Sequence, residues 1–157
     1  FVVDSPQELL NCRVVTPFKG QTQFKANGVV PIPLDFVFAF AWQNISGPSY
    51  GANYAASNAE IIPSLGRPLS GGVSTPAVAI PLVAPQTLFE DRIIRLDLRL
   101  TKIVKYNRVR LQINIDAYNA LNANSVRAVN SVYGAAWRTP LQILDPRLIQ
   151  FGGQLTF

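Results

Sequence analysis

The stretch Arg92–Asn119 reads RIIRLDLRLTKIVKYNRVRLQINIDAYN, and it consists of two runs in which apolar and polar residues alternate. In the first run Ile94, Leu96, Leu98 and Leu100 alternate with Arg95, Asp97, Arg99 and Thr101. In a strand, successive side chains point to opposite faces, so a period of two gives one apolar and one polar face. The short KYN segment at 105–107 joins the runs. The sequence therefore predicts an antiparallel hairpin that is apolar on one face and polar on the other.

The same period recurs in three other segments. QTQFKANG, from Gln21, alternates weakly, whereas FVFAFAWQ places four aromatic residues on one side: Phe36, Phe38, Phe40 and Trp42. At the end of the chain, RLIQFGGQLTF places Phe151, Gly153, Leu155 and Phe157 on one side. The sequence predicts strands at 20–30, 34–45, 92–104, 108–119 and 146–157.

The predicted connections alternate between short and long. Tight turns are expected near 31–33 and 105–107, and long connections rich in Gly, Ser, Asn, Pro and Ala cover 46–91 and 120–145. Residues 75–84, TPAVAIPLVA, resemble a strand, but two prolines argue against a central one, so we expect an excursion within the loop. Residues 1–17 are expected to be a loop that leads into the strands at 18–157.

Composition indicates either a core larger than normal or a surface that does not face water. Apolar residues make up 48% of the chain, but charged residues make up only 15%, below the roughly 25% usual in soluble domains. No apolar run reaches the roughly 20 residues of a membrane-spanning helix. The strands are longer than usual, and short turns that alternate with long loops are typical of outer-membrane barrels. We therefore expect an all-β fold: an antiparallel transmembrane β-barrel segment of about five meander strands, which is incomplete because five strands cannot close a barrel.

Several classes of function have little support. The chain has no histidine and one cysteine, Cys12, which removes the commonest general base, disulfides within the chain and most zinc sites. The net charge is +5, but arginines and lysines occur singly, which argues against nucleic-acid binding. We expect no cofactor and no catalytic or metal site. The role of Cys12 is left open.

Two groups of residues are candidates for functional contacts. The first is a polar ladder that would line the lumen of a barrel, with cross-strand pairing as the alternative: Arg95, Asp97, Arg99, Arg110, Gln112, Asn114 and Asp116. Asp97 or Asp116 is expected to pair with arginines across the strands. The second lies in the long loops, where these side chains could contact a ligand or pack over the barrel mouth: Tyr50, Tyr54, Tyr133, Trp137 and Arg138. Aromatic residues near strand ends, among them Trp42, Tyr106, Tyr118 and Phe157, suit the interfacial girdles of a barrel.

The segments RIIRLDLRLTKIVKYNRVRLQINIDAYNALNANSV and NSVYGAAWRTPLQILDPRLIQFGGQLTF, with the loop motif PSLGRPLSGG, resemble the C-terminal barrel segment of TonB-dependent outer-membrane receptors. The resemblance extends from about Phe18 to Phe157 and points to the Oar-like group, which has a carboxypeptidase-regulatory-like domain. It implies the last five strands of a plugged barrel of 22 strands that imports a nutrient across the outer membrane. It also implies that Phe151, Gly153, Leu155 and Phe157 form an assembly signal that is read by strand addition.

The implied partners are outer-membrane lipid, the rest of the barrel and its plug domain, TonB through an N-terminal part, and the barrel-assembly machinery. Because the chain begins with Phe1, we expect it to be a piece of a longer protein. Two other hypotheses stay open: part of another outer-membrane barrel, such as a porin or an adhesion-type protein, and a soluble β-sandwich that binds a ligand. The transported solute and the oligomeric state cannot be inferred from the sequence.

Overall fold

The computed structural model describes residues 11, 13–69, 71–74 and 77–157. The predicted lead-in at 1–17 therefore lies mostly outside the described residues, and so does Cys12. The part that is described is mainly β-structure in antiparallel sheets, as the sequence predicted. No helix in that part is long and apolar enough to cross a membrane.

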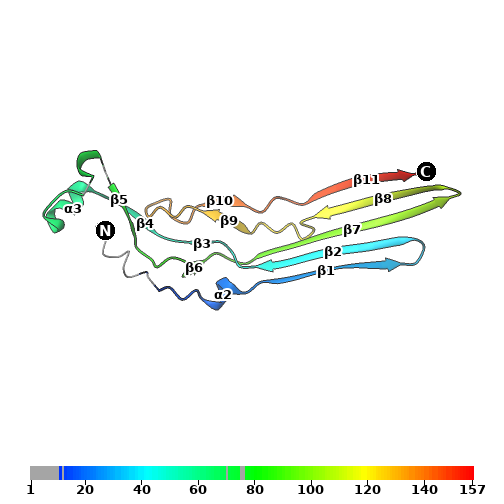
Figure 1. Cartoon of the computed structure of the whole chain (residues 1–157), viewed down its shortest axis with the longest axis horizontal. Helices are drawn as coiled ribbons and strands as arrows, with labels where there is room; N and C mark the ends of the chain where they lie inside the picture. Colours follow the sequence, from blue (N-terminus) through cyan, green and yellow to red (C-terminus); the bar gives the residue numbers. More distant parts are fainter. Residues whose placement is uncertain (1–10, 12, 70, 75–76) are drawn as a thin grey trace. The chain divides into compact units, whose positions relative to one another are not determined.

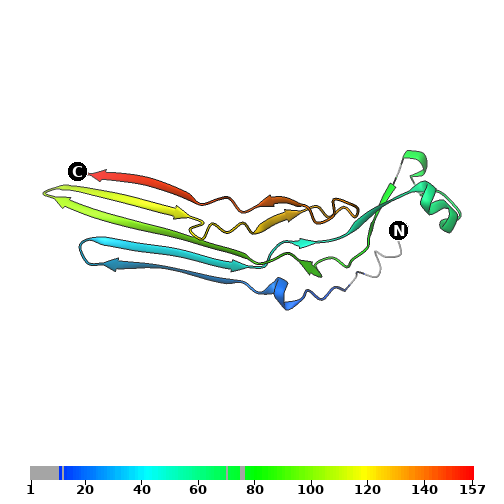
Figure 2. The same cartoon turned by 180° about the vertical axis from the view of Figure 1, so that it is seen from behind.

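The main element is an open antiparallel sheet of five strands in the order β1-β2-β7-β8-β11. Figure 1 shows these strands side by side, and Figure 2 shows the same order from behind. Their bounds are Phe24–Ile32 (β1), Phe36–Ile45 (β2), Ile93–Tyr106 (β7), Val109–Tyr118 (β8) and Leu148–Thr156 (β11). Among the described strands, none pairs with the outer edge of β1 or β11, so the sheet does not close into a barrel.

The first hairpin differs from the prediction at both ends of β1. A one-turn helix, α2 (Phe18–Gln21), occupies the predicted start of the strand, and β1 begins at Phe24. The turn lies at 33–35 rather than 31–33, because Pro31 is paired within the strand opposite Val37. Proline lacks the N–H needed for a second ladder, but β1 is an edge strand and tolerates it. The turn uses positive φ angles at Leu34 (68°) and Asp35 (57°).

The second hairpin follows the prediction closely. β7 extends to Tyr106 and β8 begins at Val109, which leaves a two-residue turn. Asn107 has a φ of 52°, in the left-handed region that asparagine tolerates better than most residues. The tight turn fixes the register of β7 against β8.

The register separates two faces across all five strands. One row of paired residues runs Val30, Phe38, Leu100, Ile115 and Phe151, and the next runs Val29, Ala39, Arg99, Asp116 and Gln150. Residues two apart along each strand share a face, so the first row belongs to an apolar face and the second to a polar face. The apolar row is exposed except at Phe38, which is half-buried: Val30 is exposed by 49%, Leu100 by 37%, Ile115 by 42% and Phe151 by 74%.

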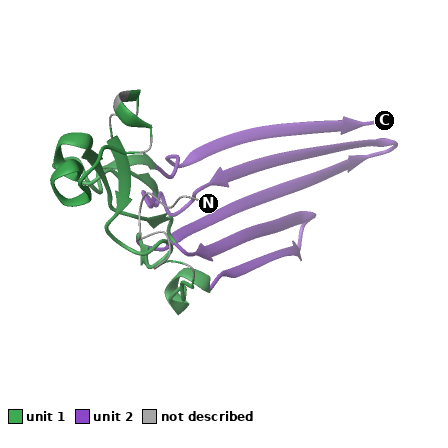
Figure 3. Ribbon diagram, turned by 60° about the vertical axis from the view of Figure 1, so that its left-hand side comes forward, with its two compact units in different colours: residues 1–21, 47–90, 127–142 green, residues 22–46, 91–126, 143–157 purple. Residues whose placement is uncertain are grey.

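The chain divides into two compact units, and the sheet belongs to residues 22–46, 91–126 and 143–157 (Figure 3). The other unit comprises residues 1–21, 47–90 and 127–142. It contains three two-stranded antiparallel sheets, β3-β6, β4-β5 and β9-β10, of which the last includes a residue of the sheet unit at each strand's end. Their bounds are Ser49–Tyr50 (β3), Asn53–Ser57 (β4), Ala77–Pro81 (β5), Leu88–Phe89 (β6), Val126–Val129 (β9) and Pro140–Ile143 (β10).

The loop unit also holds helix α3 (Asn58–Leu65) and a short 3-10 turn, η1 (Gly72–Ser74). The alternation of apolar and polar residues does not predict α3. Its signals are visible in the sequence: Ser57 and Glu60 form a capping box at its start, and Gly66 ends it with a φ of 71°. The predicted excursion at 75–84 contains β5, which pairs with β4 and is therefore a true strand, though not a central one.

Candidate functional site

The seven residues of the predicted polar ladder all lie on β7 and β8, and the register places them on the polar face. Arg99 and Asp116 are directly opposite each other and form a forked ion pair. The Arg99 Nε donates to Asp116 Oδ1, and Nη2 donates to Oδ2 over 3.0 Å. The Asp116 side chain is only 7% exposed, whereas that of Arg99 is 50% exposed. The pair therefore joins a buried carboxylate to a cation that still reaches water.

Asp97 pairs within its own strand. Its partner is Arg95, two residues away on the same strand, with Nε to Oδ1 and Nη2 to Oδ2 distances of 2.9 Å. Asp97 Oδ1 also accepts a hydrogen bond from the backbone N–H of Asn119 over 2.9 Å. Of the two predicted candidates for pairing across the strands, Asp116 therefore makes the pair. Asp97 pairs within β7, because Arg99 is bound to Asp116 and the end of β8 offers Asp97 a backbone donor.

Uncharged side chains continue the ladder toward the β7–β8 turn. Asn114 Oδ1 accepts hydrogen bonds from Thr101 Oγ1 over 2.8 Å and from Gln112 Nε2 over 3.2 Å. Thr101, which the sequence analysis did not single out, is 6% exposed. A shallow cavity of about 310 Å³ lies over the Arg99–Asp116 pair, with Ala39 and Ala41 on one side. Small residues on β2 thus leave space above the charged pair.

Tyr118 lies on a different face from the other strand-end aromatic residues of the expected girdle. It is paired with Leu148 and lies on the polar face, where it lines cavities with Arg95 and Asp97. Trp42 and Tyr106 lie on the apolar face, toward opposite ends of the strands, as a girdle requires. The sequence correctly placed Tyr118 near a strand end. Tyr118 lies two residues after Asp116 in β8, so it shares the polar face with Asp116.

Arg110 stands apart from the ion pairs of the ladder. The register places it opposite Lys105 on β7 and opposite Thr156 on β11. A polar cavity of about 130 Å³ lies beside it, lined by Arg110, Gln112, Gln154 and Thr156. Of the predicted ladder residues, Arg110 is thus a cation without a carboxylate opposite it on either neighbouring strand.

Four of the five predicted loop contacts come together in the loop unit. The Trp137 ring lies 6.3 Å from Tyr50 and 6.0 Å from Tyr133, measured between ring centroids. The Arg138 guanidinium lies 5.0 Å over the Tyr50 ring and donates to Glu90 Oε1 over 3.2 Å. Trp137 Nε1 also donates to the Gly51 carbonyl over 2.9 Å. The cluster is therefore held by specific contacts.

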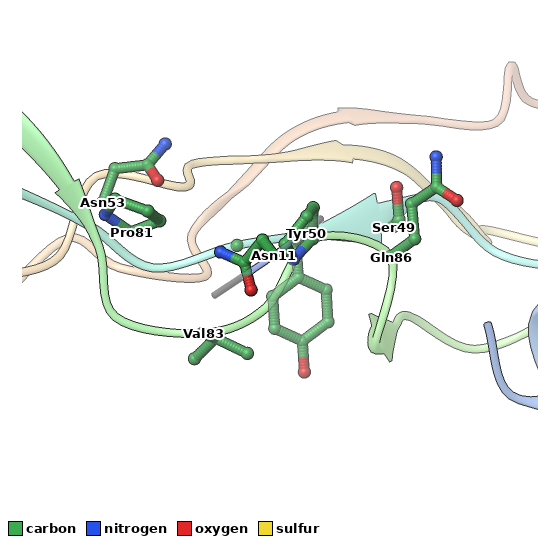
Figure 4. Close-up of a pocket in the computed structure, with 9 residues that line it drawn as sticks. Asn11, Ser49, Tyr50, Asn53, Pro81, Val83 and Gln86 are labelled. Carbon is green, nitrogen blue, oxygen red and sulfur yellow. The ribbon is translucent and has the colours of Figure 1, made fainter. Parts of the chain in front are cut away.

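A cavity of about 450 Å³ lies beside this cluster (Figure 4). Tyr50 provides an aromatic surface, and the polar groups are uncharged side chains of Asn11, Ser49, Asn53 and Gln86. Such a lining suits packing against a neutral polar ligand. Glu90 and the amide residues were not singled out in the sequence, since only the folded loops bring them to Tyr50 and Arg138.

Tyr54 lies outside the aromatic cluster. Its hydroxyl donates to Glu60 Oε1 over 2.5 Å, while Glu60 Oε2 accepts from the Ser57 backbone N–H and hydroxyl, each over 2.8 Å. The hydrogen bond from Tyr54, followed by those from Ser57, lowers the pKa of Glu60 to about 2. The same bond to Glu60 raises the pKa of Tyr54. Tyr54 therefore helps to hold the start of α3 and lies apart from the cluster around Trp137.

The α3 start is expected to loosen in acid. The folded pKa of Glu60 lies below its ordinary value of 4.5, so the contact is intact above pH 4.5 and is lost as the pH falls toward about 2. We expect the amide resonance of Ser57, followed by NMR, to shift in that window. Tyr54→Phe removes the largest cause and should move the midpoint upward, and Glu60→Gln should abolish the transition. A midpoint near 4.5 in the native chain would contradict this assignment.

The residues of the expected assembly signal lie on β11. Phe151, Gly153 and Leu155 are paired with Ile115, Ile113 and Leu111 of β8, so they share the apolar face. Phe151 and Leu155 are 74% and 58% exposed, and Phe157, which follows the strand, is 96% exposed. The structure thus shows the residues on an open sheet edge.

Within the described residues, no group of three His, Cys, Asp or Glu side chains is placed to hold a metal ion. The acidic residues of the polar face, Asp97 and Asp116, are each paired with an arginine. Comparison with known proteins adds no assignment, because no protein family, curated protein or solved structure matches the chain.

Proposed function

We propose that the chain forms five transmembrane strands of an outer-membrane β-barrel, the C-terminal part of a TonB-dependent transporter that takes up a nutrient without catalysis. The observation that carries this proposal is the contrast between the two faces of one sheet. The apolar face has exposed residues on four of the five strands, Val30, Leu100, Ile115 and Phe151, and the aromatic residues of β2 are half-buried. The polar face carries two ion pairs, and the Asp116 side chain in one of them is buried. Lipid-facing apolar residues and lumen-facing polar residues alternate in this way in membrane barrels.

The height of the apolar face supports the proposal. Trp42 lies opposite Leu96 at one end of the face, and Tyr106 ends β7 at the other. Ten residues separate Leu96 from Tyr106, which corresponds to about 34 Å along the strand. At a tilt of about 45°, this spans about 24 Å, close to the roughly 25 Å apolar band of outer-membrane barrels.

The two open edges of the sheet support the proposal that further strands complete the barrel. The outer edges of β1 and β11 present unpaired backbone N–H and C=O groups, which are templates for further strands. In the proposed barrel, the rest of the parent chain supplies those strands and the plug, and it contacts TonB. The assembly machinery would add a strand to β11 at Phe151, Gly153, Leu155 and Phe157. The loop cluster around Trp137 would lie at the outer face, where it could contact a solute.

A different outer-membrane barrel is the second candidate, because the two-faced sheet supports both equally. The parent reading frame distinguishes them: a plug domain and a TonB box upstream favour the transporter, and their absence favours a porin or an adhesion-type barrel. A soluble β-sandwich is disfavoured because its apolar face would be buried against a second sheet, whereas Phe151, Leu155 and Val30 are about half exposed or more.

The proposal predicts that the chain depends on detergent or lipid. After refolding, we expect monodisperse protein in a neutral detergent and aggregation in plain buffer, because the apolar face has no other cover. Size-exclusion chromatography with light scattering measures both states. Replacing Phe38, Leu100 and Phe151 together with glutamine should reduce aggregation in buffer, and replacing Val29, Ala39 and Gln150 on the polar face with serine should not. A monodisperse monomer in plain buffer would refute the membrane proposal.

A further inference from the structure

The end of the sheet at the β7–β8 turn carries an uncompensated positive charge. Lys105 and Arg110 are directly opposite each other on the same face, and Thr156 continues the row onto β11. Like charges directly opposite on neighbouring strands destabilise a sheet. Neither residue forms an ion pair within the described part of the chain.

The available carboxylates on this face are already engaged. Asp116 is bound by Arg99 and Asp97 is bound by Arg95, both further along the strands from the turn. Arg95 and Arg99 on this face are each paired with an aspartate, whereas Arg110 lies opposite a second cation, Lys105. The side chains of Lys105 and Arg110 are both exposed, so an anion from solution can reach them.

The groups beside Arg110 suit an oxyanion. The cavity there has a volume of about 130 Å³ and is lined by a guanidinium, two amides and a hydroxyl: Arg110, Gln112, Gln154 and Thr156. All four side chains can donate hydrogen bonds, and none carries negative charge. Its volume equals that of about four water molecules, which admits a small tetrahedral anion. Arginine offers such an anion two parallel N–H bonds.

We propose that the four residues lining this cavity, Arg110, Gln112, Gln154 and Thr156, form a binding site for a phosphate-type oxyanion at the turn end of the polar face. Lys105 adds a second positive charge from its position opposite Arg110. The site goes beyond the proposed function and does not depend on it, since it rests on the register and the cavity alone. The anion bridges Lys105 and Arg110 and so removes the repulsion between them. Its source is either free phosphate or the phosphodiester of a lipid headgroup, which share this chemistry.

The test uses the whole chain in a neutral detergent and inorganic phosphate as the probe, with chloride balancing the ionic strength. We expect phosphate to raise the denaturation midpoint, because a ligand that binds only the folded state stabilises it. Arg110→Gln should weaken the apparent affinity by about tenfold or more, and Arg110→Lys should weaken it less, because it keeps the charge but loses the fork. The matched control Lys25→Gln removes one charge from β1 on the same face and should leave the affinity unchanged.

A second measurement separates the site from a merely structural cluster. In chloride alone, Lys105→Gln should raise the denaturation midpoint, because it relieves the repulsion from Arg110. The same variant should lose most of the stabilisation by phosphate. If Lys105 and Arg110 were only structural, both variants would lower the midpoint in chloride, and that result would overturn the proposal.

The lipid source is tested with phosphatidylglycerol and phosphatidylcholine vesicles. Binding to vesicles that requires Arg110 and that inorganic phosphate displaces supports a lipid phosphodiester, which both headgroups carry. Binding to phosphatidylglycerol alone that does not require Arg110 reflects the net charge of the membrane. Stabilisation by inorganic phosphate that requires Arg110 supports a free anion. If Arg110→Gln and Lys25→Gln behave alike toward both probes, only charge screening is present and the site does not exist.

Discussion

Leu100→Arg is expected to lower the free energy of unfolding by about 2–4 kcal/mol in a phospholipid bilayer, the range for a cation placed at the midplane on the lipid side of a barrel. Leu100 lies near the middle of β7 on the apolar face, in one row with Phe38 and Ile115. The measurement is denaturant unfolding of the chain refolded in phosphatidylcholine vesicles, followed by tryptophan fluorescence. The large value arises because lipid cannot solvate the guanidinium.

Val29→Arg is the matched control for Leu100→Arg. Val29 is 68% exposed and lies opposite Ala39 on the polar face, where a cation would face water in the proposed barrel. Its expected effect is within about 0.5 kcal/mol, as for a surface substitution. In a soluble sheet Leu100, which is 37% exposed, would tolerate arginine at a loss of about 1 kcal/mol or less. Equal effects of the two variants would contradict a lipid-facing apolar face.

Arg99→Gln is expected to destabilise the sheet more than Asp116→Asn, although both break the same ion pair. Loss of Arg99 leaves the Asp116 carboxylate, whose side chain is 7% exposed, without its partner, and we expect a loss of about 3 kcal/mol. Loss of Asp116 leaves Arg99, which is 50% exposed and can turn to water, so a loss of about 1 kcal/mol is expected. Denaturant unfolding in neutral detergent measures both.

The double variant provides the internal check. Arg99→Gln with Asp116→Asn removes the stranded carboxylate, so it should be more stable than Arg99→Gln alone. Arg95→Gln is the matched control, because its partner Asp97 is 23% exposed and keeps a bond from the Asn119 backbone, and its loss should be about 1 kcal/mol. If Asp116→Asn proved the more damaging single change, the assignment of Asp116 as the buried partner would be wrong.

The alternation of residues predicted the strands well, because it reflects a local property of extended chain. Between Ile94 and Leu100, alternate residues were predicted to lie on opposite faces, and in β7 they do. Ends were less predictable. Helix α2 occupies the position where the first residues of β1 were predicted. The turn lies later than predicted, because Pro31 is accommodated within an edge strand. Helix α3 was missed although Ser57, Glu60 and Gly66 mark its two ends.

The candidate sites were predictable as residue types but not as groups. Tyr50 and Trp137 are far apart in the chain, and only the folded loops join them and add Glu90 through Arg138. Arg110 is a second example, because the sequence predicted it only as a member of the polar ladder. Its position opposite Lys105 and Thr156 instead makes it an anion site in our proposal.

Period two, low charge and long strands are properties of each segment alone, so they are sufficient for the all-β class and for which residues share a face. The register in which those segments pair is not a property of each segment alone. Whether Asp116 meets Arg99 depends on the turn at Asn107, and a slip of one residue would exchange the faces of β8. Register arises from hydrogen bonds between separate strands, and for this reason the ion pairs, the loop cluster and the unpaired charges at the turn became visible only in the folded chain.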